Sequence, residues 1–271
     1  MILVTTAGLG SMDQYASELS SRLPEVSVLA TDESQRIERQ FNRSLWSLDS
    51  LRALRADINV VKCLRQIDEP LHFPNHHLAR YARFLDVPYV VTVHDLIRYF
   101  DLSRHEPLIH RPNLRDRIHL ALDYSGIRRA TAIIAVSNTT KADIVEHLGV
   151  PESRIHVVYD GVDPRRFHPT QARPFEYPYI LYVGSEHPRK NLAELIEAFA
   201  MLKASGQFPD LRLVKVGAAG GSESDFRGAT QRLIDEYGIA DHVVIADRVH
   251  DDALPAYYAG AACTVMPSLY E

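Results

Sequence analysis

Residues 179–202, YILYVGSEHPRKNLAELIEAFAML, join a strand pattern to a helix pattern through a short basic loop. The first six residues, Tyr179 to Gly184, are mostly apolar and end in glycine, which is typical of a buried strand. Apolar residues then recur at the spacing of one helix face: Leu192, Leu195, Ile196, Phe199 and Leu202. Strand, loop and helix in this order form the repeating unit of a parallel α/β sheet.

Two cations, Arg189 and Lys190, lie in this loop, between the C-terminal end of the predicted strand and the first turn of the predicted helix. In a doubly wound sheet, ligands bind at this edge. A helix N-terminus attracts anions and the two side chains add positive charge, so the loop indicates a phosphate or diphosphate site. A solvated Arg–Lys pair in a surface loop is the alternative, and the loop alone leaves both interpretations open.

The composition of the 271-residue chain is that of an ordinary globular protein, with 46% hydrophobic and 24% charged residues. With 30 basic and 35 acidic residues the formal charge is −5, which argues against a protein that coats nucleic acid. No apolar run approaches the ~20 residues of a membrane-spanning helix, and the start MILVTTAGLG predicts no signal peptide. Only Cys63 and Cys263 occur, both in apolar sequence surroundings, so we expect no disulfide framework, no zinc site and a cytoplasmic protein.

The alternation of strands and helices occurs twice along the chain. Strands of the first part are predicted at residues 1–5, 26–30, 70–73, 89–93, 132–136 and 155–159, and one helix is predicted to begin after Ser137 and end at Gly149. Residues 169–178 hold three prolines, which is typical of a linker. The alternation then restarts, with strands at 179–183, 211–216, 242–246 and 262–266 and helices at 191–203, 224–236 and 252–259. We therefore predict an α/β fold with two Rossmann-like domains, residues 1–168 and 179–271, joined by the linker 169–178.

Two segments of the first part are basic and helical in pattern. Residues 35–65 carry seven Lys or Arg against three Asp or Glu, around the apolar stripe Leu45, Leu48, Leu51 and Leu54. Residues 111–129 predict a second basic helix, with an apolar side formed by Leu114, Ile118, Leu122 and Ile127. A basic amphipathic surface can rest on anionic lipid, although it is more often a solvated helix face above the core, so peripheral contact with a membrane stays open.

Three further stretches carry groups that could bind a ligand. Gly8 and Gly10, in AGLGSM after the first strand, permit a tight turn and the close approach of a ligand, although this is not a full GxGxxG. His94 stands at the C-terminal end of a predicted strand, where it would face the cleft of the sheet. The glycines 217, 220 and 221 could cradle a phosphate, with a plain flexible loop as the alternative.

A histidine cluster, HFPNHH at residues 72–77, raises the question of a metal site. No acidic or cysteine ligand stands near it in the sequence, so we assign no metal to it. The chain also lacks a GxSxG elbow, a Walker loop and an HExxH motif.

Four stretches together resemble a known family. They are VTVHDL at 91–96, AIIAVSNTTKADIVEHLGVPESRIHVVYDGVD at 132–163, YVGSEHPRKNLAELIEAF at 182–199 and ADHVVIADRVHDDALPAYYAGAACTVMPSLYE at 240–271. With them the chain resembles the family-4 retaining glycosyltransferases of the GT-B fold, and most of all their mannosyltransferase-like branch, which builds bacterial surface polysaccharides. The resemblance covers nearly the whole chain, and PRKN followed by PSLYE is its most specific part.

The resemblance implies a reaction and its partners. A sugar, mannose or another hexose, would pass from a nucleotide-sugar to an acceptor hydroxyl with retained anomeric configuration, and neither a cofactor nor a metal would be required. The implied partners are the nucleotide-sugar donor and a glycan or lipid-linked glycan acceptor, with no nucleic acid. The implied location is cytoplasmic, at or near the inner face of the membrane.

The resemblance also implies roles for particular residues. Arg189 and Lys190 would meet the donor diphosphate beside Gly184, and the backbone around Val249 would contact the base. His94 would stand near the transferred sugar and the departing phosphate. Glu271 would hold sugar hydroxyls as the first of two family glutamates. The loop with Gly8 and Gly10 would lie near the diphosphate and the acceptor.

Departures from the family pattern keep other functions open. Ser185 stands where many relatives carry an arginine, which would make diphosphate neutralisation depend more on Arg189 and Lys190. The sequence ends at Glu271, inside the PSLYE motif, so we expect an incomplete second domain and little or no transferase activity from a fragment of this kind. A sugar-nucleotide epimerase and a non-catalytic nucleotide-sugar-binding protein are the alternatives.

Overall fold

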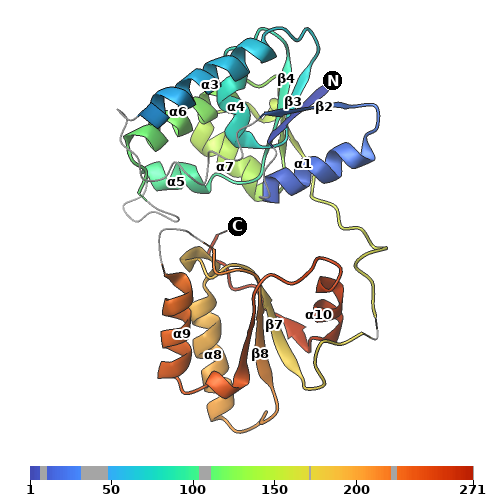
Figure 1. Ribbon diagram of the computed structural model, residues 1–271, viewed down its shortest axis with the longest axis vertical. Coiled ribbons are helices and arrows are strands. Elements are labelled where there is room, and N and C mark those ends of the chain that lie inside the picture. The colour runs from blue at the N-terminus through green and yellow to red at the C-terminus, as the bar shows by residue number, and fades with distance from the viewer. Residues whose placement is uncertain (7–10, 32–47, 104–110, 171, 221–224, 271) are drawn as a thin grey trace. The chain divides into compact units, whose positions relative to one another are not determined.

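The computed structural model describes residues 1–6, 11–31, 48–103, 111–170, 172–220 and 225–270. The chain divides into two compact units, Met1–Asp160 and Gly161–Glu271. Each unit contains its own parallel β-sheet covered by helices (Figure 1). The predicted α/β fold class with two Rossmann-like parts is therefore confirmed, and the second sheet is the smaller one.

The first unit is built on a six-stranded sheet in the order β2-β1-β3-β4-β5-β6. Its strands are β1 (Ile2–Thr6), β2 (Ser27–Thr31), β3 (Leu71–Phe73), β4 (Tyr89–Val93), β5 (Ala132–Ala135) and β6 (Ile155–Val157), and all neighbours pair in parallel. All six lie where the apolar runs predict them, within two residues at either end. The central strands are buried on both faces, as parallel strands between two helical layers must be.

Helices cover this sheet, and the residues at the two ends of α7 show how the sequence sets a helix boundary. They are α1 (Ser11–Arg22), α3 (Leu48–Leu64), α4 (Ala79–Ala82), α5 (Ile97–Ser103), α6 (Leu114–Arg129) and α7 (Asn138–Leu148), with 3₁₀ turns η1 (His76–Leu78) and η2 (Glu152–Arg154). The Ser137 side chain accepts a hydrogen bond from the Thr140 amide and caps α7, and Gly149 ends α7 in the left-handed conformation (φ 64°). Both predicted ends of α7 are therefore confirmed.

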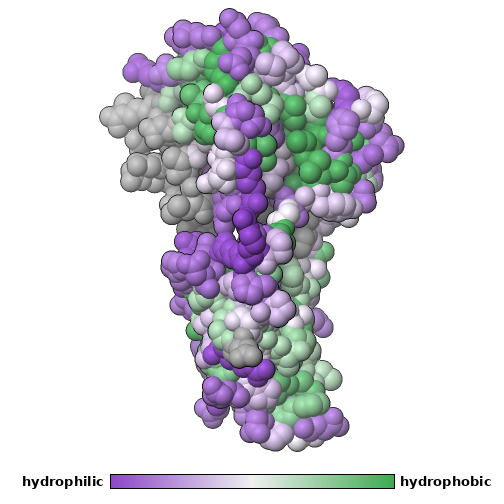
Figure 2. Space-filling model, turned by 90° about the vertical axis from the view of Figure 1, so that its right-hand side faces the viewer, coloured by the Kyte–Doolittle hydropathy of each residue, from purple (hydrophilic) through white to green (hydrophobic). Residues whose placement is uncertain are grey.

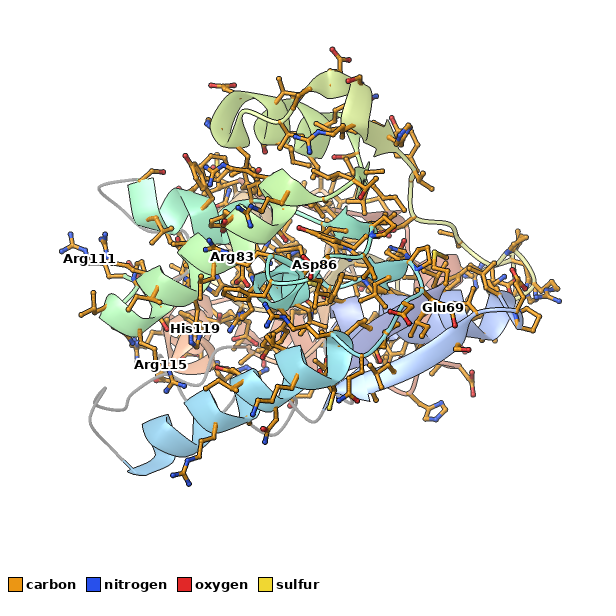
Figure 3. All side chains as sticks on the ribbon, turned by 90° about the horizontal axis from the view of Figure 1, so that it is seen from above. Glu69, Arg83, Asp86, Arg111, Arg115 and His119 are labelled. Atoms are coloured by element: carbon orange, nitrogen blue, oxygen red, sulfur yellow. The ribbon has the colours of Figure 1, made fainter. Side chains whose placement is uncertain are left out.

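The predicted apolar side of the basic helix 111–129 is wrong at two positions. Leu114 and Ile118 are 62% and 48% exposed, whereas Leu120, Tyr124 and Ile127 are buried. The buried face is set by contact with α4, where a Cβ on Gly126 would lie 1.9 Å from the carbonyl oxygen of Ala79. Arg111 and Arg115, near the N-terminal end of α6, reach outward (Figure 3).

The second unit is built on a four-stranded sheet in the order β10-β7-β8-β9. Its strands β7 (Tyr179–Val183), β8 (Arg212–Val216), β9 (Val243–Ala246) and β10 (Cys263–Thr264) are all parallel. Helices α8 (Leu192–Ala204) and α9 (Phe226–Glu236) share one apolar cluster with the sheet, and α10 (Leu254–Gly260) shares another. The two clusters involve alternate strand residues, so they lie on opposite faces, with α10 across the sheet from α8 and α9 (Figure 1).

The boundary between the units falls before the expected linker. Because the second unit begins at Gly161, residues 169–178 lie within it. Phe175 stacks on Tyr177 and meets the edge of Tyr179, with ring centroids 5.0 Å and 5.6 Å apart. Part of the expected linker is therefore packed on the second sheet, because its aromatic residues find an apolar face there.

The surface mixes apolar and hydrophilic side chains, as Figure 2 shows for one face. Scattered exposed apolar groups are normal for a folded protein and indicate no particular function. Both cysteines are free thiols at exposed positions. In the part of the chain that the structure describes, no helix combines the length and the apolar character needed to span a bilayer.

Candidate functional site

The order of the second sheet places the basic turn where ligand sites form in such folds. Strands β8 and β9 follow β7 on one side, while β10 returns to pair with β7 on the other side. The crevice at such a reversal of strand order, beyond the carboxyl ends of the strands, is the usual ligand site of an open parallel sheet. The loop after β7 therefore lies at this carboxyl edge, next to the reversal of strand order.

A single 3₁₀ turn, η3 (Pro188–Lys190), carries Arg189 and Lys190 between β7 and α8. Asn191 follows with φ 55°, and it is the only non-glycine residue in the described part of the chain with a positive φ. Asparagine tolerates this left-handed conformation better than most residues. The turn thus presents two cations directly before the N-terminus of α8, whose amides favour anions.

The end of the chain packs against this turn. The Leu269 amide donates to the Arg189 carbonyl at 2.8 Å, and the Arg189 guanidinium donates to the Tyr270 carbonyl at 3.2 Å. The two motifs that make the family resemblance specific, PRKN and PSLYE, are therefore in direct contact although about 80 residues separate them. This contact places the segment before Glu271 beside the basic turn.

Gly184 ends β7 in close backbone contact with the next loop. Its amide donates to the Val216 carbonyl at 2.9 Å, and a Cβ on Gly217 would lie 2.7 Å from the Gly184 carbonyl oxygen. Gly217 has φ 119°, which only glycine adopts readily. Glycine is therefore needed at Gly217 because two loops pack closely there. A phosphate contact at Gly217 or Gly220 stays a prediction, and Gly221 lies outside the described residues.

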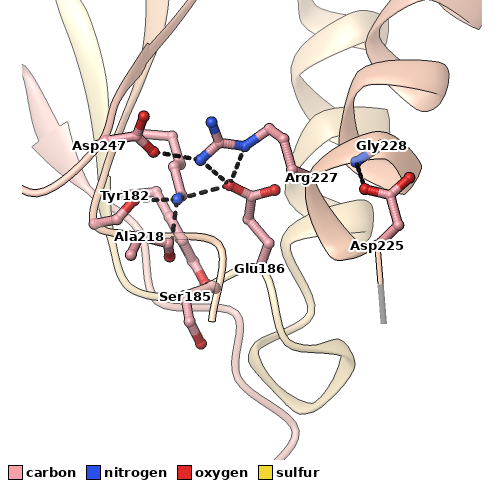
Figure 4. A network of polar contacts seen from close by, with 10 residues as sticks. Tyr182, Ser185, Glu186, Ala218, Asp225, Arg227, Gly228 and Asp247 are labelled. Carbon is pink, nitrogen blue, oxygen red and sulfur yellow. Dashed lines mark hydrogen bonds and ion pairs between the residues drawn. The ribbon is translucent and has the colours of Figure 1, made fainter. Parts of the chain in front are cut away.

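A buried ion network lies beneath the two loops and has no counterpart in the sequence predictions (Figure 4). Glu186 Oε1 accepts from Lys215 Nζ at 2.8 Å and from Arg227 Nε at 2.7 Å. Arg227 Nη2 also donates to Asp247 Oδ1 at 2.6 Å. The side chains of Glu186 and Lys215 are 0% and 2% exposed. A lysine inside an apolar strand, LRLVKVG, was the available signal, because a buried lysine requires a partner.

The network keeps Glu186 ionised. Burial alone would raise the pKa of this carboxyl, but hydrogen bonds from Arg227 and Lys215 outweigh it and hold the pKa below its usual range. The charges of the four side chains sum to zero, so the network supplies no free cation to a ligand. Its direct effect is to join the loops after β7, β8 and β9.

Val249 lies in the loop after β9, at the same carboxyl edge of the second sheet. Its side chain packs on the apolar cluster formed by Tyr179, Leu181, Val214 and Val216. A packed side chain fixes the course of the neighbouring backbone, which is the part expected to contact the base. The expected base contact itself remains a prediction.

His94 follows β4, at the carboxyl edge of the first sheet. Its Nε2 lies 3.0 Å from the Pro74 carbonyl oxygen, which can only accept, so Nε2 donates this hydrogen bond and leaves Nδ1 as the other polar atom of the ring. The Tyr15 ring meets the imidazole edge-on at 4.9 Å, and the Thr140 hydroxyl donates to the His94 carbonyl at 3.1 Å. The ring is therefore held by Pro74, which follows β3, and by Tyr15 of α1, while Thr140 of α7 holds the His94 backbone.

His76 and His77, near His94, have partners that are distant in the sequence. His77 Nδ1 lies 3.3 Å from Asp123 Oδ2, and Arg80 binds the same carboxylate at 2.8 Å and 3.2 Å. His76 Nδ1 accepts from the His94 amide at 3.4 Å, and burial lowers its pKa well below the ordinary value. Among the described residues, no group of three potential ligands is arranged to hold a metal ion.

Three of the expected site residues lie outside the described residues, namely Gly8, Gly10 and Glu271. Gly184, Arg189 and Lys190 all lie in the segment between β7 and α8, at the carboxyl edge of the second sheet, and Val249 lies at the same edge. His94 stands in the first unit.

Comparison with known proteins places the chain in a family. Residues 11–166 match the model of glycosyltransferase family 4, and residues 164–271 match that of glycosyl transferases group 1. The MMP α-(1→4)-mannosyltransferase of Mycolicibacterium hassiacum is 31% identical over 144 residues, which are 53% of this chain and 33% of that protein. The chain spans about half, or less, of the length of the curated relatives it matches.

Solved structures share the fold at low sequence identity. Sucrose-phosphate synthase from Thermosynechococcus elongatus superposes with a TM-score of 0.72 at 18% identity, covering 100% of this chain and 76% of that one. Anabaena HepE, solved in complex with UDP-glucose, superposes with a TM-score of 0.72 at 16% identity, covering 99% and 74%. The family model covers more than half of the sequence and the two-sheet fold agrees with it, so this chain belongs to glycosyltransferase family 4.

Proposed function

We propose that this protein transfers a hexose, such as mannose, from a nucleotide-sugar to a hydroxyl of a glycan or lipid-linked glycan, with retention. The second unit would bind the donor and the first unit the acceptor. Synthesis of a bacterial surface polysaccharide, on the cytoplasmic side of the membrane, is the proposed setting. It follows from the branch of the family that the motifs resemble.

The basic turn at the crevice of the second sheet carries this proposal. Arg189 and Lys190 lie together on η3, at the reversal of strand order between β7 and β10 and before the N-terminus of α8. Two cations and helix amides at such a crevice suit a diphosphate. HepE, with a similar fold, was solved with UDP-glucose, which supports a nucleotide-sugar as the ligand class.

In the proposed sugar transfer, stabilising the departing nucleoside diphosphate matters more than a strong base that deprotonates the acceptor. Cleavage of the anomeric bond places negative charge on the departing nucleoside diphosphate, and fixed cations stabilise that charge most in the transition state. We propose that Arg189 and Lys190 do this without a metal ion. The acceptor hydroxyl would attack on the face that the diphosphate leaves, and a phosphate oxygen would take its proton, which retains the configuration.

In the first unit, His94 suits a role close to the transferred sugar. Its Nε2 is committed to the Pro74 carbonyl, so the ring is oriented before any ligand binds. Nδ1 has no hydrogen-bond partner among the described residues and can accept from a sugar hydroxyl. We propose that His94 orients the sugar during transfer and contributes little to the affinity for the nucleotide.

A panel of nucleotide-sugars separates the proposed function from its alternatives. UDP-, GDP-, ADP- and dTDP-hexoses are titrated by calorimetry and then incubated with candidate glycan acceptors, and products are followed by mass spectrometry. Binding of one donor followed by acceptor-dependent transfer with retention supports the proposal. Binding without turnover, also in a longer version that extends past Glu271, would indicate a non-catalytic binding protein. Conversion of the donor without an acceptor would indicate an epimerase, and no binding of any donor would refute the proposal.

A further inference from the structure

The network of Glu186, Lys215, Arg227 and Asp247 is buried at Glu186 and Lys215, and it joins four segments at one edge of the second sheet (Figure 4). Glu186 lies in the loop after β7, three residues before Arg189, and Asp247 directly follows β9. Lys215 is in β8, and its Nζ also donates to the carbonyls of Gly217 and Ala218 in the next loop. The network therefore connects the turn that carries the cations to both neighbouring loops.

The first turn of α9 holds the basic loop through two adjacent residues. Arg227 donates to Glu186 at 2.7 Å, and the Phe226 ring meets the His187 ring edge-on at 5.2 Å. The loop backbone adds a hydrogen bond from the Glu186 amide to the Ala219 carbonyl at 2.7 Å. Contacts of both side chain and backbone therefore hold Glu186, and a ring contact holds His187, directly before Pro188.

Stability gives little reason for this arrangement. Withdrawing the charge of Lys215 from water is costly, and well-packed apolar side chains at such a site are often equally stable or more stable. Asp247 is 67% exposed, so its pair with Arg227 is in contact with water and adds little to stability. Burying these charges costs free energy of desolvation, and the network joins loops at the proposed ligand site. Its role is therefore better explained by fixing the position of these loops than by stabilising the fold.

We propose that this network positions the basic turn for the donor diphosphate, which makes Glu186 and Arg227 positioning residues of the transfer reaction. The inference rests on the proposed function, because it assumes that the turn binds a diphosphate. Arg227 is the decisive member. Its planar guanidinium reaches Glu186 and Asp247 at once, which a lysine ammonium cannot do in the same way.

The test compares two arginines of the same helix in the full chain. Arg227→Met removes the network contact, and Arg232→Met removes an exposed pair, since Arg232 lies 3.8 Å from Asp225 with both side chains more than 70% exposed. UDP, GDP, ADP and dTDP are titrated into each protein by calorimetry. We expect Arg227→Met to weaken the tightest of them about tenfold, Arg227→Lys to fall between it and the wild type, and Arg232→Met to bind as the wild type does.

Hydrogen exchange identifies the cause of the loss. Positioning requires faster exchange of amides 184–191 in Arg227→Met than in Arg232→Met, measured without nucleotide. In a second variant pair, Glu186→Gln leaves the buried lysine without its counter-charge, while Glu186→Gln combined with Lys215→Met removes both charges. We expect the double variant to regain thermal stability relative to Glu186→Gln without regaining nucleotide affinity.

Three outcomes are decisive against the inference. Wild-type affinity in Arg227→Met would overturn it, as would a loss of affinity with unchanged exchange at 184–191, because the latter would mean direct contact with the nucleotide. Recovery of affinity together with stability in the double variant would also overturn it. Failure of the wild-type chain to bind any of the four diphosphates would instead refute the proposed function on which the inference rests.

Discussion

Arg189 and Lys190 are neighbours on one turn, yet the structure gives them different surroundings. Arg189 is bound to the end of the chain through Tyr270 and Leu269, so its guanidinium is partly engaged in holding two family motifs together. Such a contact orients the arginine before a ligand arrives, which reduces the entropy lost on binding. We therefore expect the two cations to contribute differently, Arg189 through the shape of the site and Lys190 as a point charge.

Replacing Lys190 with alanine should weaken the binding of the nucleoside diphosphate by about 1.5–3 kcal/mol, the range for a charge-assisted hydrogen bond. Calorimetry measures this loss. The matched control is Lys203→Ala at the other end of α8, where Nζ donates to the carbonyls of Phe208 and Pro209 at 2.9 Å and 2.6 Å. That change should lower the melting temperature and leave the affinity intact. Equal affinities in Lys190→Ala and the wild type would remove Lys190 from the site.

Asn191 determines how the basic turn leads into α8. At φ 55° a β-branched side chain is strained by roughly 1–2 kcal/mol, whereas glycine has no such penalty. Asn191→Val should therefore lower the free energy of unfolding by about that amount and weaken diphosphate binding, because Lys190 directly precedes it. Asn191→Gly should preserve both quantities within a few tenths of a kcal/mol. Urea unfolding and calorimetry on both variants test this, and two equally affected variants would contradict it.

In a complete homologue, the change that corresponds to His94→Ala should lower turnover strongly and change the nucleotide affinity little. The reason is that His94 belongs to the first unit, while the diphosphate and base are assigned to the second. Steady-state kinetics with the identified donor gives kcat, and calorimetry gives the nucleotide Kd. His156→Gln, at an exposed position of β6, is the control for loss of a histidine. Full turnover in His94→Ala would show that this histidine only joins β4 to Pro74.

At the scale of elements, strands β3 and β4 are joined by a buried histidine. His72 Nε2 and Thr92 Oγ1 are 2.8 Å apart, and His72 is 5% exposed. Burial lowers the pKa of His72 to about 4, so the folded protein keeps this imidazole neutral at pH values where the unfolded chain protonates it. The stability contributed by the neutral form is complete above pH ~6.5 and is lost as the pH falls toward about 4.

The first unit should therefore lose stability in mild acid. Between about pH 7 and about pH 5 the wild type should lose about 2 kcal/mol through His72 alone, and His72→Gln should show a loss smaller by that amount. Urea unfolding followed by circular dichroism measures the difference. The exposed His156→Gln should keep the wild-type pH dependence. If His72→Gln and the wild type lose equal stability, the imidazole is protonated in the folded state and the assignment fails.

At the scale of the whole molecule, two sheets with separate apolar cores lie in one chain. Each unit buries its own strands, and the donor site is assigned to the second unit alone. A ligand that binds one folded unit stabilises that unit by mass action, by about 2.7 kcal/mol at a hundred times its Kd. The proposed function thus predicts an uneven response of the molecule to nucleotide.

We expect two calorimetric transitions on heating, of which the tightest-binding nucleoside diphosphate raises only one by a few degrees. Variants identify the transitions, because Glu186→Gln lowers the one that belongs to the second unit and His72→Gln alters the one that belongs to the first. The nucleotide should raise the transition that Glu186→Gln lowers. A shift confined to the other transition would place the nucleotide in the first unit and contradict the proposal.

The local patterns of the sequence were sufficient for the elements of this fold. Apolar runs that end in glycine mark β7 and β8, helical spacing marks α8, and Ser137 and Gly149 mark the ends of α7, because each signal depends on residues a few positions apart. Arg189 and Lys190 could be proposed as an anion site for the same reason. Between the carboxyl end of a parallel strand and the following helix, the location of a ligand loop follows from local order.

Contacts between distant segments could not be read from those patterns. The order β10-β7-β8-β9, which places Tyr270 against Arg189, depends on how apolar faces pack across the whole unit. The same holds for Glu186 with Lys215 and for His77 with Asp123, pairs that are 29 and 46 residues apart. A charged residue in an apolar strand indicates that a partner is needed, but the sequence does not indicate which residue it is. The partner depends on the folded arrangement of strands and loops, because only in the folded protein are the charges withdrawn from water and brought close together.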